Sequence, residues 1–327
     1  MIFTTGATGL VGSHICRRFL AEGHSIRALK RKNSDLTLIA DIQEKIEWVE
    51  GDILDIRCLE HFLENVEMVI HAAAIISFVS SEKERMFQHN IEGTANIINT
   101  CLKLGISRFI HVSSIAALGR PVNGSLISEK TQWEESKFNT DYAKSKYLSE
   151  IEVWRGSAEG LNVTIVNPSI VLAPGDLNKS STRIFKHVMD EKRLYTDGSL
   201  NYVDVRDVAD AIFHLWDKNI QNERFILNAG SITYESFFKQ IAVLLDKKPP
   251  TIKVSTSLLF LAVMIERIKS ILTGNKPLLT RQTALGAKKV FKYSNDKIKS
   301  TLGFKFRPIQ DTLEWSCKEL LAKQNLS

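Results

Sequence analysis

Short apolar segments recur along the first half of the chain, and longer segments with helical patterning separate them. Apolar runs of four to eight residues are typical of buried strands. Strands alternating with helices at regular spacing indicate right-handed β-α-β units, and hence a Rossmann-type, doubly wound parallel sheet of the α/β class. Strands are expected at residues 1–5, 25–32, 46–50, 68–74, 108–114 and 162–166, and helices between them, among these residues 81–104.

The pattern changes after Pro174, where the regular alternation ends. We expect residues 1–171, with a return segment at about 196–228, to form the dinucleotide-binding domain. Residues 172–195 and 229–327 should form a smaller, mostly helical, substrate-binding part. Residues 258–265 are apolar on all sides, which fits a helix buried in that part or one resting on a membrane surface.

Composition and charge narrow the classes of function. The chain has 327 residues, 44% of them hydrophobic and 24% charged, as in ordinary globular proteins. Its four cysteines lie far apart without metal-type spacing, so we expect reduced thiols, no metal site and a cytoplasmic location. The net charge of +6 is concentrated after residue 246, but no nucleic-acid-binding motif accompanies it. We therefore expect a solvated basic face and no nucleic-acid partner.

The first strand runs into a glycine-rich turn with glycines at positions 6, 9 and 12. Glycines permit a tight turn and let a pyrophosphate approach backbone amides at the positive end of a helix. The spacing Gly-x-x-Gly-x-x-Gly differs from the common Gly-x-Gly-x-x-Gly. The residues expected to bind the cofactor here are Gly6, Thr8, Gly9, Leu10, Val11 and Gly12.

The end of the second strand carries cations where an NAD-binding protein usually has a carboxylate. Lys30, Arg31 and Lys32 stand there, and such a cluster suits the 2′-phosphate of NADP. We therefore expect NADP, with NAD as the alternative. Further cofactor contacts are expected from residues that follow later strands, namely Asp52, Ile53, Ala72, Ala73, Ala74, Asn167, Pro168 and Ser169.

A phenol and an ammonium stand four residues apart in a helix-compatible segment, at Tyr142 and Lys146. They should share one helix face, where the cation should lower the tyrosine pKa from its usual value near ~10. Such a pair can donate a proton to a carbonyl oxygen. The same spacing recurs at Tyr293 and Lys297, where no other motif supports catalysis.

The order of the motifs resembles that of the extended short-chain dehydrogenase/reductases, also grouped as the NAD(P)-dependent epimerase/dehydratase superfamily. Within it the chain looks most similar to the dihydroflavonol-reductase-like and hydroxysteroid-dehydrogenase-like groups. The resemblance covers essentially the whole chain. The motifs that carry it are the glycine turn, Asn-Ile-Glu-Gly-Thr at 90–94, Ser-Ser at 113–114, Tyr-x-x-x-Lys at 142–146, Asn-Pro-Ser-Ile-Val at 167–171 and Phe-Lys-Phe-Arg-Pro at 304–308.

The resemblance implies roles for individual residues. Tyr142 matches the catalytic acid/base, Lys146 the lysine that holds the nicotinamide ribose, and Ser114 the hydroxyl that binds the substrate oxygen. Both Tyr142 and Lys146 would also contact the cofactor. Gly119 follows Ser114 by five residues, as a glycine does in related epimerases, and this favours Ser114 over Ser113. Lesser candidates for substrate contact are Ser77, Asn90 and Ser113.

Three functions fit this reading. The first is an NADP(H)-dependent oxidoreductase acting on a small-molecule carbonyl compound or alcohol. The second is a nucleotide-sugar epimerase or dehydratase with bound NAD(P), which should have further acid/base groups where Ile115, Ala116 and Ala117 stand. The third is a non-catalytic dinucleotide sensor, for which the Ser-Tyr-Lys set would be superfluous. The substrate, the direction of the reaction and the oligomeric state, with a homodimer as the candidate, stay open.

Overall fold

The computed structural model describes residues 1–121, 124–254 and 290–324. Within these residues the chain forms a parallel sheet of seven strands in the order β10-β6-β5-β4-β1-β2-β3. The predicted doubly wound α/β fold is thereby confirmed. The strands are β1 (Ile2–Thr5), β2 (Ile26–Lys30), β3 (Ile46–Glu50), β4 (Met68–His71), β5 (Arg108–Val112), β6 (Asn162–Pro168) and β10 (Glu223–Leu227).

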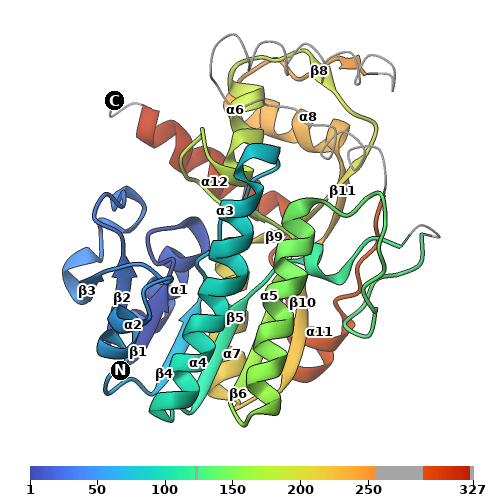
Figure 1. The fold of residues 1–327 in the computed structure, drawn as a ribbon. Helices are drawn as coiled ribbons and strands as arrows, with labels where there is room; N and C mark the ends of the chain where they lie inside the picture. The colour runs from blue at the N-terminus through green and yellow to red at the C-terminus, as the bar shows by residue number, and fades with distance from the viewer. Residues whose placement is uncertain (122–123, 255–289, 325–327) are drawn as a thin grey trace.

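Helices cover both faces of this sheet. Neighbouring residues of each strand point to opposite sides, so each face supplies apolar side chains to a core of its own. Ile2 and Ile70 pack with residues of α1 (Leu10–Ala21) and α7 (Val205–Asp217). Phe3 and Val69 pack on the other face with α4 (Gly93–Leu104) and α5 (Asp141–Ala158), which lie side by side in Figure 1. The helix α2 (Ile56–Phe62) completes that second layer.

A smaller group of elements packs around a third core, seen at the top of Figure 1. Its strands β7 (Ile170–Leu172), β9 (Ser199–Asp204) and β11 (Gly230–Thr233) form one sheet, and β8 (Leu194–Tyr195) and β12 (Ile252–Lys253) form another. Its helices are α6 (Arg183–Met189), α8 (Tyr234–Leu245) and α12 (Ile309–Gln324). Most of these elements come from the two segments that were expected to bind substrate. The strand β9, however, comes from the return segment that was expected in the dinucleotide-binding domain, and β7 lies across the expected boundary at residue 171.

Residues 296–306 also lie in a different part of the molecule from the one expected from the sequence. The helix α11 (Asp296–Leu302) contacts the edge strand β10, and Ile298 is buried in the core between the large sheet and α1. Phe304 and Phe306 pack against the same core. Residues 296–306 therefore belong with the large sheet, whereas the sequence placed them in the substrate-binding part. The rest of that division stays a prediction.

The long helix expected at residues 81–104 is interrupted. The structure has α3 (Lys83–Phe87), a π-helical turn at Gln88–Glu92 and then α4. The backbone carbonyl of Asn90 accepts hydrogen bonds from the hydroxyls of Thr94 and Ser149, at 2.6 and 2.5 Å. Side-chain donors at a carbonyl compete with the regular helical ladder, which explains the wider turn here.

The apolar segment 258–265 lies outside the described residues, so neither reading of it is tested. In the part of the chain that the structure does describe, no helix is both long enough and apolar enough to cross a membrane.

Candidate active site

The glycine turn lies between β1 and α1, at the carboxyl edge of the sheet. Gly6 has a positive φ of 73°, and a Cβ there would lie 2.7 Å from the backbone carbon of Ala72. A Cβ on Gly12 would lie 2.1 Å from the Gly6 carbonyl oxygen. These positions therefore require glycine, and the first turn of α1 contains no acidic residue. The backbone here fits a pyrophosphate at the helix N-terminus.

Three cations were expected to bind the 2′-phosphate of NADP, and one of them forms an ion pair within the protein. Lys30 lies opposite Glu50 in the β2–β3 register, and its Nζ is 3.4 Å from the Glu50 carboxylate. The side chains of Arg31 and Lys32 are exposed and form no ion pair with any described residue. The backbone NH of Arg31 donates to the Ser34 hydroxyl at 3.0 Å, which fixes the turn. Sequence reasoning missed Glu50, because only the strand register brings it beside Lys30.

The residues expected near the adenine and along the cofactor follow the next strands. The Asp52 carboxylate accepts from the Leu54 backbone NH at 3.0 Å and lies 4.0 Å from the His89 ring. Ile53 is buried, whereas Ala72 and Ala73 are partly exposed and Ala74 is exposed just after β4. The three alanines directly follow β4, and their contact with the cofactor stays a prediction.

Ser114 and Tyr142 meet at the same edge of the sheet. Ser114 follows β5, and its hydroxyl accepts a hydrogen bond from the Ala116 NH at 3.2 Å. Tyr142 stands in the first turn of α5, which Thr140 caps by accepting from the Ala143 NH at 3.0 Å. The side chains of Ser114 and Tyr142 share a hydrogen bond. The ring of Phe78 packs edge-on against Tyr142, with centroids 6.0 Å apart.

The electrostatics of the pair differ from the expectation that Lys146 lowers the tyrosine pKa. Burial raises the pKa of Tyr142 to about 12, and only the hydrogen bond with Ser114 opposes this effect. Burial also lowers the pKa of Lys146 to about 8, despite the nearby Glu150 carboxylate. The Lys146 Nζ donates to the Val112 carbonyl at 3.1 Å and lies 3.3 Å from His111 Nε2. The Lys146 ammonium is thus directed at β5, and it is desolvation that sets the pKa of the Tyr142 phenol.

The lesser substrate candidates are held by protein partners in different ways. The side chain of Asn90 bonds both the NH and the carbonyl of Ile75 and donates to Ser145, so it fastens the loop after β4 to α5. Ser77 donates to the Glu82 carboxylate at 2.6 Å. Ser113 is buried, and its hydroxyl has no hydrogen-bond partner among the described residues. Of the two adjacent serines, Ser114 is the one that meets Tyr142.

Asn167 joins the serine loop to α5. Its amide donates to the Ser114 carbonyl at 2.9 Å and to the Glu150 carboxylate at 2.6 Å. Glu150 also pairs with Arg224 of β10 at 3.3 Å. Pro168 ends β6, and the Ser169 hydroxyl donates to the Leu227 carbonyl at 3.3 Å. Glu150 and Arg224 escaped sequence reasoning; the spacing of Glu150, four residues after Lys146, was the available signal for the first.

The second Tyr-x-x-x-Lys match has a different geometry. Tyr293 forms an isolated bridge with Ile127, and α11 begins only at Asp296. Tyr293 and Lys297 therefore do not share one helix face. Burial raises the Tyr293 pKa, against a side-chain hydrogen bond with Arg120, and Lys297 pairs with Glu223 at 2.6 Å. Only Tyr142 and Lys146 combine the spacing with one helix and a neighbouring serine.

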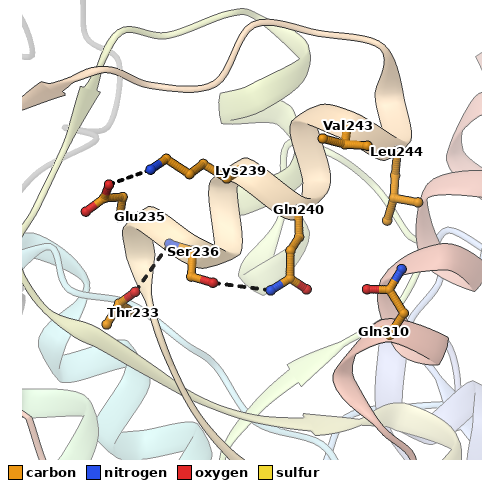
Figure 2. A pocket seen from close by; sticks show the side chains of 8 residues that line it. All are labelled: Thr233, Glu235, Ser236, Lys239, Gln240, Val243, Leu244 and Gln310. Atoms are coloured by element: carbon orange, nitrogen blue, oxygen red, sulfur yellow. Dashed lines mark hydrogen bonds and ion pairs between the residues drawn. The ribbon is translucent and has the colours of Figure 1, made fainter.

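Open pockets elsewhere on the surface do not involve the predicted site residues. Figure 2 shows a pocket of about 470 Å³ along α8, where Glu235 and Lys239 form an ion pair and Gln310 approaches from α12. A second pocket, of about 720 Å³, lies along β10 and α11, with Arg224 and Lys297 in its lining. Their linings mix polar and charged residues with apolar ones, among them Val243 and Leu244 in the first pocket and Trp154 in the second. Neither lining contains a predicted site residue, and the hydrogen-bonded Ser114 and Tyr142 remain the better candidate.

Comparisons with known proteins agree with this geometry. The profile of the NAD dependent epimerase/dehydratase family matches residues 2–230. The chain is 30% identical over 259 residues to sterol demethylase protein B of Methylococcus capsulatus, covering 78% of this chain and 77% of that protein. It is 30% identical over 254 residues to a putative dihydroflavonol 4-reductase of Synechocystis, covering 76% and 73%.

Among solved structures, the dTDP-glucose 4,6-dehydratase DesIV of Streptomyces venezuelae, with NAD and TYD bound, superposes with a TM-score of 0.81. The two chains are 18% identical, and the match covers 99% of this chain and 98% of the other, so it supports the fold. The family profile, by contrast, spans the glycine turn, Ser114, Tyr142 and Lys146. The chain therefore belongs to the NAD-dependent epimerase/dehydratase family, within the extended short-chain dehydrogenase/reductases, and is an NAD(P)-dependent oxidoreductase.

Proposed function

We propose that this protein is an NADP(H)-dependent oxidoreductase that reduces a ketone or aldehyde, or oxidises a secondary alcohol, on a small molecule. The observation that carries the proposal is the hydrogen bond between Ser114 and Tyr142 at the carboxyl edge of the sheet. In a parallel sheet this edge is shared by the end of β5 and by the glycine turn after β1. The donor pair and the cofactor turn are therefore on one side of the molecule.

The cofactor would be held by the glycine turn, by Arg31 and Lys32, and by Lys146. When bound, its nicotinamide supplies or accepts the hydride. Tyr142 is neutral below its pKa of about 12 and can therefore donate a proton to a carbonyl oxygen at neutral pH. Ser114 offers a second hydroxyl to the same oxygen and steadies its negative charge. In alcohol oxidation Tyr142 would take the proton instead.

The choice of NADP rests on the exposed cations after β2. Arg31 and Lys32 have no ion pair among the described residues, so both are free to meet a phosphate. Glu50 is the residue that argues for NAD, because its carboxylate reaches the end of β2. Since Glu50 is paired with Lys30 at 3.4 Å, we infer that NADP is preferred and keep NAD as the alternative.

The names of the relatives support reduction, and those of the structural neighbours suggest the competing function. One relative is named as a dihydroflavonol 4-reductase, whereas DesIV is a sugar-nucleotide dehydratase. A nucleotide-sugar epimerase or dehydratase needs acid/base groups beside the serine. Here Ser114 is followed by Ile115, Ala116 and Ala117, of which the two alanines are buried. The reductase is therefore the better-supported candidate.

The test is a turnover screen with the full chain. Ketones and aldehydes are offered with NADPH or NADH, and secondary alcohols with NADP or NAD, while nicotinamide absorbance is followed. Nucleotide sugars are offered in parallel, and their products are separated chromatographically. Stoichiometric NADPH consumption with a carbonyl compound is the expected result. Conversion of a nucleotide sugar without net cofactor consumption would favour the epimerase or dehydratase, and cofactor binding without turnover in either arm would favour a sensor.

A further inference from the structure

The ammonium of Lys146 is buried against acceptors that carry no charge. The residue is 1% exposed, and its Nζ bonds the Val112 carbonyl at 3.1 Å and His111 Nε2 at 3.3 Å. Among the described residues no carboxylate comes within 4.0 Å of it, although Glu150 stands one helical turn further along α5. A buried cation is costly unless it is hydrogen-bonded. These neutral acceptors are its hydrogen-bond partners among the described residues, and the Glu150 carboxylate adds a longer-range attraction.

The contact fixes the protonation state of His111. An ammonium has only donors, so Nε2 must accept and the ring proton must sit on Nδ1. A second proton would turn Nε2 into a donor and set two cations against each other. His111 is fully buried, and burial together with Lys146 holds its pKa well below the usual value. The imidazole is thus a neutral acceptor throughout the physiological range.

A second buried histidine, His71 of β4, backs this ring at a centroid distance of 5.3 Å. The Thr94 hydroxyl donates to the Asn90 carbonyl at 2.6 Å, so it must accept from His71 Nε2, 3.0 Å away. Nδ1 of His71 then accepts from the Thr5 hydroxyl at 2.7 Å. Both ring nitrogens of His71 are used, and the ring is locked in its neutral form.

We propose that His111 is a positioning residue that holds the Lys146 ammonium at the end of β5. The ring of His71 packs against the His111 ring and keeps it in place. A core aromatic residue would fill the same space without binding the cation. The distinction lies in the acceptor at Nε2, which phenylalanine lacks and glutamine can replace. The consequence for cofactor affinity rests on the proposed function, whereas the effect on Lys146 itself does not.

The test compares His111→Phe, which keeps a ring and removes the acceptor, with His111→Gln, which offers an amide oxygen. Phe109→Leu serves as the control, because Phe109 is a buried ring of the same strand that stacks on His111. The pKa of Lys146 is followed by NMR of protein labelled at the lysine Cε carbon, with the signal assigned from its loss in Lys146→Met. The other titratable groups around Lys146 are His71 and His111 of the sheet and Tyr142 and Glu150 of α5.

Removing the acceptor should destabilise the ammonium, so His111→Phe should lower the Lys146 pKa by about one unit or more. His111→Gln and Phe109→Leu should leave that pKa near the wild-type value. An unchanged Lys146 pKa in folded His111→Phe would overturn the proposal, as would an equal decrease in Phe109→Leu. If His111→Phe does not fold, His111→Leu is measured against the same criterion.

A second readout separates this inference from the proposed function. NADPH affinity at pH 7.5 should fall about threefold in His111→Phe, because a Lys146 pKa lowered by one unit from about 8 leaves about a third as much of the ammonium at that pH. The affinity should recover in His111→Gln. A lowered Lys146 pKa with undiminished NADPH affinity would leave His111 as the positioning residue and would remove Lys146 from the cofactor site. A lost affinity in both variants with an unmoved pKa would instead mean a structural defect and would overturn the role of His111.

Discussion

The side-chain amide of Asn167 donates a hydrogen bond to the backbone carbonyl of Ser114, 2.9 Å away. The same amide nitrogen donates to Glu150 of α5 at 2.6 Å. One buried side chain of β6 therefore sets the distance between the loop that carries Ser114 and the helix that carries Tyr142. The sequence suggested Asn167 only as a neighbour of the nicotinamide, and the structure adds this second role.

Asn167→Asp should be strongly destabilising. The substitution replaces a donor with a carboxylate that faces the Ser114 carbonyl and the buried Glu150. We expect the free energy of unfolding to fall by about 2 to 4 kcal/mol, the range for a buried acceptor left without its donor. Urea denaturation checks this value. Asn99→Asp is the matched control, because Asn99 is exposed and its oxygen already accepts from Arg155. A loss below 1 kcal/mol in Asn167→Asp would contradict the bridging role.

The sheet could be predicted because its signal is local. Apolar runs and glycine breaks at regular spacing identified the strands of the large sheet from β1 to β6, with end errors of a few residues. The edge strand β10 was reached only as part of a return segment, since Glu223–Leu227 has a single weak run. The interruption at Gln88–Glu92 depends on hydroxyls from other turns that meet the Asn90 carbonyl, and Ser149 lies far away in the sequence.

The sequence could predict which residues form the site but not their pKa values. Spacing placed Tyr142 and Lys146 on one helix, and the structure has both in α5. Their pKa values depend on burial, on the Ser114 hydroxyl and on the Glu150 carboxylate. The Lys146 ammonium also contacts His111, which comes from β5 and carries no motif of its own. The pairing of Lys30 with Glu50 depends on strand register in the same way. Contacts set by tertiary packing are the ones that the sequence could not supply.

Arg31→Ala should discriminate between the two cofactors. An exposed arginine without an ion pair among the described residues can bond a 2′-phosphate, so its loss should weaken NADPH binding by about 1.5 to 3 kcal/mol. NADH binding should change little, because NADH lacks that phosphate. Calorimetric titration with both cofactors measures the difference. Arg57→Ala, which removes an exposed arginine at the start of α2, should affect neither. Equal losses for NADPH and NADH, or a native preference for NADH, would refute the assignment.

Cofactor affinity should depend on pH through Lys146. The pKa of Lys146 is lowered to about 8, so its side chain is protonated below that pH and loses its charge as the pH rises through it. NADPH affinity should therefore be highest below about pH 8 and decline above it. Lys146→Arg should keep its affinity at higher pH, because a guanidinium stays protonated. Lys146→Met should bind weakly at every pH.

Lys144→Met provides the control for this pH series. Lys144 is an exposed lysine of the same helix, paired with Glu135 at 2.9 Å, and its loss should leave the profile in place. Fluorescence titration of NADPH from pH 6 to 10 gives the profiles. A decline of the same size in Lys146→Arg would show that another group titrates.

The central claim is that Tyr142 is the proton donor. Tyr293, in the second Tyr-x-x-x-Lys match, serves as the control for it. Turnover is measured for Tyr142→Phe and Tyr293→Phe with the carbonyl substrate found in the screen, after circular dichroism has verified folding. Tyr142→Phe should reduce kcat by about 10²- to 10⁴-fold, the contribution of a general acid. Among the described residues the Tyr293 side chain hydrogen-bonds with Arg120, so Tyr293→Phe should cost about 1 kcal/mol of stability and leave kcat within about twofold. Comparable losses of kcat in both variants, or full activity in Tyr142→Phe, would contradict the account.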